Sequence, residues 1–126
     1  MGKKVHHISK ERLTIAQIET IISGDYILAL SEEARTAIVK CREFLDLKIA
    51  RSEAPIYGIN TGFGSLCDTE IEDQDLQKLQ RNLVISHACG MGEKVPNLVV
   101  KLMILLKIQS LSYGHSGVQI ATVDRL

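Results

Sequence analysis

The spacing of hydrophobic positions predicts a mainly helical chain. Between residues 31 and 50, apolar side chains recur at intervals of three or four, the period of one helix face. They are Ala34, Ile38, Cys41 and Leu45. Ser31 stands directly before this run and is a residue type that caps helix N-termini. The pattern therefore predicts a helix that begins after Ser31.

The same reasoning predicts a shorter helix before it and a third helix after it. Thr14 precedes AQIETIIS with Gln17 in the capping-box position, and Gly24 is a natural stop. A third helix is expected from Asp73 to Ala88, ended by the glycines that follow it at 90 and 92. Three leucines would share one face of this helix: Leu76, Leu79 and Leu83.

A fourth predicted helix, over residues 96–113, is apolar nearly all the way round. Such a helix is normally buried on every side, and three short amphipathic neighbours are too few to enclose it. Its natural partners are therefore expected outside this chain. A further helix begins after Gly117 and meets no cap or breaker before residue 126, so we interpret residues 1–126 as a truncated piece.

Strand signals are weak and lie near the N-terminus. They are VHHI, beginning at Val5, and YILAL, from Tyr26 to Leu30. Two such runs predict a small hairpin or an edge pair. The expected fold class is mainly α with little β structure.

Composition excludes several classes of partner. The 126 residues carry 15 Lys and Arg against 15 Asp and Glu, so the chain lacks the strong positive field that nucleic acid or an anionic membrane attracts. The three cysteines have no paired spacing, and the N-terminus has no apolar signal-peptide core. The window VPNLVVKLMILL contains Lys101 and is too short to span a membrane. We therefore expect a cytoplasmic protein.

The segment YGINTGFG, residues 57–64, is the clearest candidate for chemistry. Gly58, Gly62 and Gly64 supply the backbone freedom that a closing lid needs. The spacing matches neither a dinucleotide fingerprint nor a P-loop. Tyr57 can exchange a proton, although a phenol ordinarily keeps its proton at neutral pH, so that role requires surroundings that favour phenolate. The alternative is a tyrosine that packs the loop against a helix.

Two further clusters fit catalytic or metal sites poorly. His87 and Cys89 lack the second pair of ligands that zinc requires, so no metal is expected. Ser86 and His87 are sequence neighbours, and adjacent helix positions do not face each other, so a hydrolase dyad is disfavoured. GHSG, residues 114–117, lacks the fifth position of the nucleophile elbow and is better interpreted as a turn between helices.

Taken in order, three blocks resemble the N-terminal part of the histidine and phenylalanine ammonia-lyase family. They are YGINTGFG (57–64), LQRNLVISHACGMG (79–92) and MILLKIQSLSYGHSGV (103–118). The resemblance covers roughly residues 10–126. It implies the helical-bundle fold of the ammonia-lyases, which is fumarase/aspartase-like, and a homotetramer whose active sites draw residues from several subunits.

The resemblance also implies roles for the loop. Tyr57 would be the catalytic acid/base near the substrate's β-carbon. The lid would consist of Gly58, Asn60, Thr61, Gly62, Phe63 and Gly64. Family members carry a methylidene-imidazolone electrophile formed from Ala-Ser-Gly, and no metal or nucleotide is expected. This chain has no Ala-Ser-Gly, and its nearest look-alike is His115-Ser116-Gly117.

Substrate choice in the family is associated with two neighbouring positions, which here are Ser86 and His87. A Ser-His pair resembles the histidine-specific members, and His87 could hydrogen-bond an imidazole. We therefore expect a parent enzyme that converts L-histidine to urocanate and ammonia, with the 126 residues inactive alone. The alternatives are a phenylalanine or tyrosine ammonia-lyase or aminomutase, and a non-catalytic helical assembly module.

Overall fold

A computed structural model describes residues 3–51, 56–57, 59, 61–62, 64 and 71–126. Contacts divide the chain into two compact units. The first unit combines Met1–Leu47 with Val95–Leu126, and the second is Lys48–Lys94. Among the described residues, no helix is both long enough and apolar enough to span a membrane.

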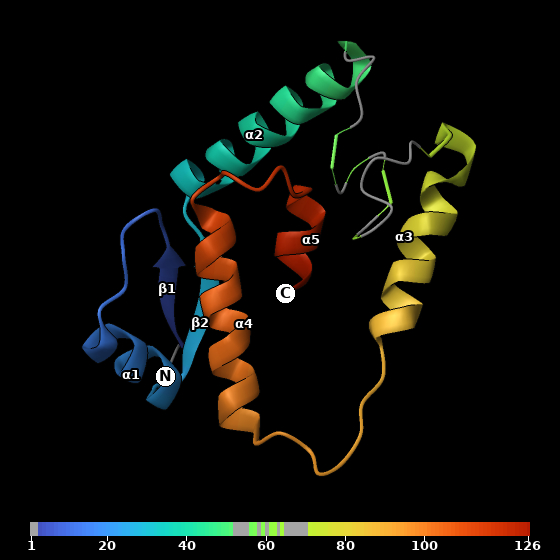
Figure 1. The fold of residues 1–126 in the computed structure, drawn as a ribbon. Helices are drawn as coiled ribbons and strands as arrows, with labels where there is room; N and C mark the ends of the chain where they lie inside the picture. The colour runs from blue at the N-terminus through green and yellow to red at the C-terminus, as the bar shows by residue number, and fades with distance from the viewer. Residues whose placement is uncertain (1–2, 52–55, 58, 60, 63, 65–70) are drawn as a thin grey trace. The chain divides into compact units, whose positions relative to one another are not determined.

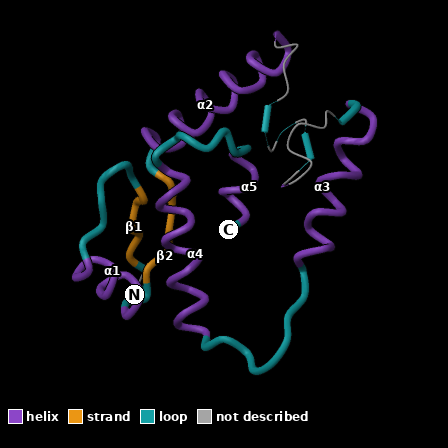
Figure 2. The backbone as a smooth tube through the Cα atoms, in the orientation of Figure 1, coloured by secondary structure: helices purple, strands orange, loops and turns teal. Residues whose placement is uncertain are grey.

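The first unit begins with a strand, a helix and a second strand. β1 (Lys4–Ile8) pairs in parallel with β2 (Tyr26–Leu30), and α1 (Ile15–Ser23) connects them (Figures 1 and 2). The register runs from Lys4 opposite Tyr26 to Ile8 opposite Leu30. The predicted strand pair is confirmed, but the hairpin alternative is wrong. A helical crossover returns the chain to the end of the sheet at which β1 begins, as parallel pairing requires.

The two predicted caps set the starts of α1 and α2. Thr14 Oγ1 accepts from Gln17 N at 3.3 Å, and Gln17 Oε1 accepts from Thr14 N at 2.8 Å, which completes the capping box. α1 ends before Gly24, as the sequence predicts. Ser31 Oγ accepts from Ala34 N at 3.1 Å at the start of α2 (Glu32–Arg51).

The core of the first unit lies where the strands, α1 and α2 meet α4 (Asn97–Ser112) and α5 (Ile120–Arg125). In Figure 1, α4 runs alongside the strand pair. Seven buried apolar side chains form the core: Ile8, Ile21, Ile38, Leu105, Ile108, Leu111 and Val123. A cavity of about 580 Å³ borders this core, and none of the predicted site residues lines it.

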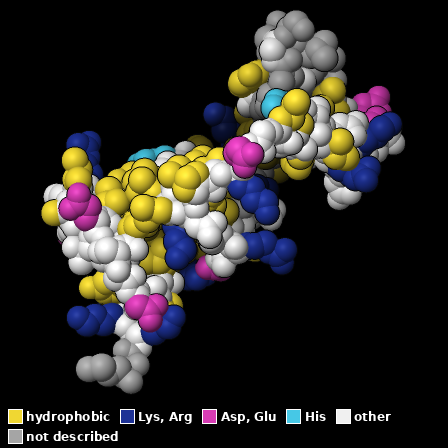
Figure 3. Space-filling model, turned by 90° about the horizontal axis from the view of Figure 1, so that it is seen from below, with side chains coloured by type: hydrophobic (Ala, Val, Ile, Leu, Met, Phe, Trp, Pro, Cys, Tyr) yellow, Lys and Arg dark blue, Asp and Glu magenta, His cyan; other side chains and the backbone are white. Residues whose placement is uncertain are grey.

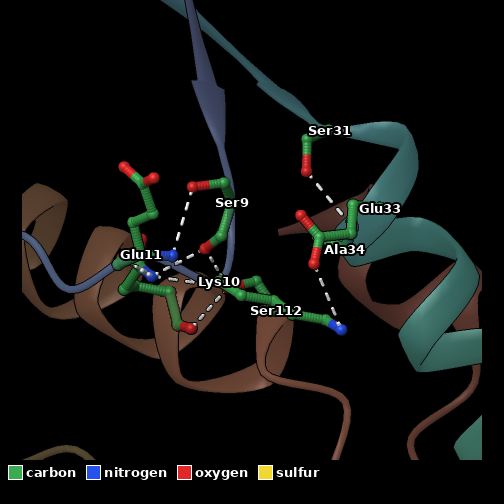
Figure 4. Close-up of polar contacts among 8 residues, drawn as sticks. Ser9, Lys10, Glu11, Ser31, Glu33, Ala34 and Ser112 are labelled. Atoms are coloured by element: carbon green, nitrogen blue, oxygen red, sulfur yellow. Dashed lines mark hydrogen bonds and ion pairs between the residues drawn. The ribbon is translucent and has the colours of Figure 1, made fainter.

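A polar clamp joins α4 to the segment after β1. Gln109 Nε2 donates to the backbone oxygens of Ser9 and Glu11 at 2.9 and 3.0 Å, and Ser112 Oγ donates to Ser9 O at 2.9 Å. Figure 4 shows Ser112 beside Ser9 and Glu11. Gln109 and Ser112 are both buried, so these bonds satisfy carbonyl groups that are otherwise costly to remove from water.

An ion pair fixes α5 to α2. The guanidinium of Arg35 donates both Nη1 and Nη2 to the carboxylate of Asp124, at 3.1 and 2.6 Å. These hydrogen bonds raise the pKa of Arg35 above its ordinary value. The forked geometry holds two elements that are far apart in sequence in one orientation.

The N-terminal part of α4 is not enclosed by the rest of the described chain. Six of its apolar side chains are exposed: Leu98, Val99, Val100, Met103, Ile104 and Leu106. Figure 3 shows hydrophobic side chains gathered on the first unit, interspersed with Lys and Arg. The prediction that neighbouring helices cannot bury α4 is confirmed for the described residues.

In the second unit, α3 spans Asp73–His87. Leu76, Leu79 and Leu83 are partly buried while the residues between them are exposed, so the predicted leucine face is confirmed. The helix ends at His87, one residue before the predicted end. Its C-cap is Ala88, whose N–H donates to Val84 O, and not one of the predicted glycines.

Candidate active site

The structure describes part of the 57–64 loop. Ile59 N donates to Ile56 O at 3.0 Å, which closes a turn around Tyr57. The Tyr57 side chain is 64% exposed. Gly58, Asn60 and Phe63, which belong to the predicted lid, lie outside the described residues. The turn therefore leaves Tyr57 largely exposed at the position predicted for the proton-transfer group.

The later part of the loop differs from its start. Thr61 is fully buried, and its Oγ1 donates to Gly62 O at 3.0 Å. Gly64 has φ +59°, in the left-handed region that favours glycine. A Cβ added at Gly64 would meet no atom of the described residues within 4 Å, so the positive φ is the observed reason for glycine there.

Ser86 and His87 lie together at the end of α3, in the same unit as Tyr57. Ser86 Oγ is 3.1 Å from His87 Nδ1. The expectation that adjacent helix positions keep these side chains apart is therefore wrong. Both side chains turn back toward the Leu83 carbonyl, which lies one helical turn earlier, and meet there.

The shared carbonyl argues against a nucleophilic dyad. Ser86 Oγ donates to Leu83 O at 2.9 Å, and His87 Nδ1 is 2.8 Å from the same oxygen. A general base must accept the serine proton, yet here both groups are directed to a backbone acceptor. The pair is suited to binding, and the exposed side chains leave it open to a ligand.

Sequence reasoning missed the Leu83 carbonyl. A histidine in the last turn of a helix can bond a backbone carbonyl one turn earlier, here in addition to the carbonyl's ordinary hydrogen bond within the helix. The i, i+4 relation between Leu83 and His87 was the signal that could have revealed this contact.

The other sequence candidates have structural roles or lie apart. Among the residues that the structure describes, no group of three His, Cys, Asp or Glu side chains could hold a metal ion. The 114–117 segment forms the predicted turn between α4 and α5, with φ +72° at Gly114 and +66° at Gly117. Cys89 is exposed.

The residues present do not supply the precursor of a methylidene-imidazolone. That group requires Ala-Ser-Gly, and the chain has none. In the nearest look-alike, Gly117 packs against Leu45, so closely that an added Cβ would lie 2.6 Å from Leu45 Cδ2. This tripeptide serves the turn between two helices.

Sequence comparison relates the chain to a known family. The aromatic amino acid lyase family matches residues 13–126, and the chain belongs to that family. The histidine ammonia-lyase of Aromatoleum aromaticum is 47% identical over 115 residues, which are 91% of this chain and 22% of that protein. That of Deinococcus radiodurans is 42% identical over 114 residues, 90% of this chain and 22% of that protein.

Solved structures agree with this membership. The histidine ammonia-lyase of Trypanosoma cruzi superposes with a TM-score of 0.80 at 30% identity, over 97% of this chain and 23% of that one. The tyrosine aminomutase of Streptomyces globisporus superposes with a TM-score of 0.83 at 26% identity, over 94% and 22%. The chain thus spans less than a quarter of the length of these proteins.

Proposed function

We propose that the protein containing this chain deaminates L-histidine without oxidation, giving urocanate and ammonia. The Ser86-His87 pair at the open end of α3 carries the proposal, because its polar atoms suit an imidazole side chain. Family membership supports ammonia-lyase chemistry. The relatives from Deinococcus radiodurans and Aromatoleum aromaticum, at 42% and 47% identity, are histidine ammonia-lyases.

Tyr57 is the proposed base that removes the β-proton of the substrate. Its exposure in a closed turn supports this role. Gly58, Asn60, Thr61, Gly62, Phe63 and Gly64 form the proposed lid that carries Tyr57 to the substrate. The left-handed Gly64 supports a backbone pivot at the end of this segment.

In this proposal, the electrophile and the rest of the active site come from residues other than 1–126. Ammonia loss needs an electrophile that makes the amine a better leaving group, and a methylidene-imidazolone supplies that chemistry. Its Ala-Ser-Gly precursor would come from another part of the polypeptide. The proposed assembly is a cytoplasmic homotetramer, which would cover the exposed apolar side chains of α4.

Ultraviolet absorbance of the expected products tests the proposal. The complete reading frame that contains these residues is expressed and mixed separately with L-histidine, L-phenylalanine and L-tyrosine. Formation of urocanate alone supports histidine as the substrate. Cinnamate or coumarate without urocanate would refute the assignment to histidine and retain ammonia-lyase chemistry.

An aminomutase is the second candidate, favoured by the superposition on the tyrosine aminomutase. Chromatography of the same reactions would then detect a β-amino acid. A third alternative, a non-catalytic helical assembly module, is favoured by the exposed α4 side chains and the absent Ala-Ser-Gly. It predicts a folded protein that forms neither kind of product.

A further inference from the structure

The Leu83 carbonyl determines which nitrogen of His87 carries a proton. Nδ1 lies 2.8 Å from Leu83 O. A carbonyl oxygen only accepts hydrogen bonds, and a lone pair on Nδ1 at that distance would be repelled by it. The proton of a neutral His87 ring is therefore on Nδ1, which leaves Nε2 as an acceptor.

The Ser86 hydroxyl is oriented by the same oxygen. Its Oγ lies 2.9 Å from Leu83 O and donates to it. A hydroxyl has one proton, so Oγ keeps only lone pairs for other partners. One of these lone pairs faces Nδ1 at 3.1 Å, which agrees with a proton on that nitrogen.

We infer that the backbone oxygen of Leu83 holds His87 as the Nδ1–H tautomer, so that Ser86 and His87 offer a substrate only hydrogen-bond acceptors. The side chain that fits them carries an N–H or O–H donor, as a neutral imidazole does. A phenyl ring has no donor and would leave the acceptors unpaired, at a cost in affinity. This consequence for substrates rests on the proposed function, whereas the tautomer does not.

Nitrogen NMR tests the tautomer directly. The complete protein is labelled with ¹⁵N-histidine, and comparison with its His87→Gln variant identifies the His87 signals. We expect a protonated Nδ1 and an unprotonated Nε2 in the neutral form of the ring. A proton on Nε2, or a mixture of tautomers, would overturn the inference. This measurement needs no turnover, so it stands whether or not histidine is the substrate.

The Ser86→Ala variant separates the carbonyl from the hydroxyl as the cause. Leu83 O remains available to His87 in this variant, so we expect the same tautomer. A shift of the proton to Nε2 would mean that Ser86, and not the backbone, orients the ring.

Substrate analogues test the acceptor-only pair in the complete protein. The two N-methyl-L-histidines have no ring N–H when neutral, and their methyl groups lie on opposite nitrogens. We expect each isomer to bind about tenfold more weakly than L-histidine, since in the complex an acceptor atom of the pair then faces a lone pair of the ligand ring. In one of the two isomers the methyl group points away from the pair, so steric exclusion cannot explain a loss in both. Binding of either isomer as tightly as L-histidine would overturn the inference.

Matched glutamine variants complete this test. In His87→Gln the amide can present either its oxygen or its nitrogen, so the preference for L-histidine over the N-methyl isomers should shrink. His7→Gln, at an exposed position of β1, should keep the full preference. An undiminished preference in His87→Gln would show that another group reads the ring proton.

Discussion

At the scale of single residues, short polar side chains in this chain are oriented by backbone carbonyls. Ser86 and His87 converge on Leu83 O, and Gln109 and Ser112 converge on Ser9 O. The first pair is exposed and keeps acceptor atoms for a ligand, whereas the second is buried. The same bonding pattern thus stabilises the buried contact in one place and, in the proposed function, orients a substrate-binding pair in the other.

Tyr57→Phe should lower turnover of the complete protein by about a hundredfold or more, because the ring keeps its shape but loses its proton-transfer group. Steady-state rates with L-histidine measure the effect, and circular dichroism checks that the fold is unchanged. Tyr26→Phe, in the first unit, is the matched control and should keep normal rates. Near-normal turnover in Tyr57→Phe would remove this residue from the proposed mechanism.

Gln109→Glu should destabilise the chain by about 3 kcal/mol or more at neutral pH, because a carboxylate would face the oxygens of Ser9 and Glu11. Burial and these oxygens favour the protonated form, so the introduced carboxyl should have a raised pKa. Relative stability should therefore be best at low pH and fall as pH rises through that pKa. Urea midpoints across pH measure this dependence.

Gln80→Glu, on the exposed face of α3, provides the control and should change stability little at any pH. Equal midpoints for the two variants at neutral pH would contradict the role assigned to the clamp.

At the scale of elements, local signals in the sequence predicted the helices well. Thr14 and Ser31 cap α1 and α2 because their side chains satisfy free N–H groups within three residues. The parallel direction of β1 and β2 was not predictable in this way. It depends on α1 packing beside the strands, and a pair of short apolar runs does not encode that packing.

Gly114→Ala should destabilise the chain by about 3 kcal/mol. The position has φ +72°, and the new Cβ would lie 2.7 to 2.9 Å from atoms of Ala37. Gly92→Ala is the matched comparison, since its φ is +83° but a Cβ there would meet no atom of the described residues within 4 Å. It should cost only about 1 kcal/mol, from backbone strain. Thermal or urea unfolding distinguishes the two, and similar losses would show that crowding against α2 contributes nothing.

At the scale of the whole molecule, the site could be only partly predicted from the sequence. The YGINTGFG and SHACG segments located the candidates, yet the orienting role of Leu83 was invisible because every residue has a carbonyl. The roles of Tyr57, Ser86 and His87 stay predictions. The sequence did predict that neighbouring helices cannot cover α4, because its apolar residues lie on all sides. Those residues show that the helix needs a covering surface, but they do not identify that surface.

Met103→Lys should weaken self-association of the complete protein, because Met103 is 63% exposed on α4 and a buried lysine at an apolar interface is costly. Light scattering coupled to size-exclusion chromatography should show a smaller species than the unmodified protein. Gln80→Lys, an equal charge change on an exposed polar position of α3, should leave the mass unchanged. An unchanged assembly in Met103→Lys would exclude this part of α4 from the interface.

The clamp between Ser9 and Gln109 also bears on how the chain matures during translation. The two residues are 100 positions apart, and a ribosome adds about 5 to 20 residues per second. The segment after β1 therefore waits roughly 5 to 20 seconds before the side chain that secures it has been synthesised. During that interval β1, α1 and β2 can already pair locally, but their exposed apolar surface has no α4 to cover it. Nascent chains arrested before residue 109 should consequently be the ones that depend most on chaperones.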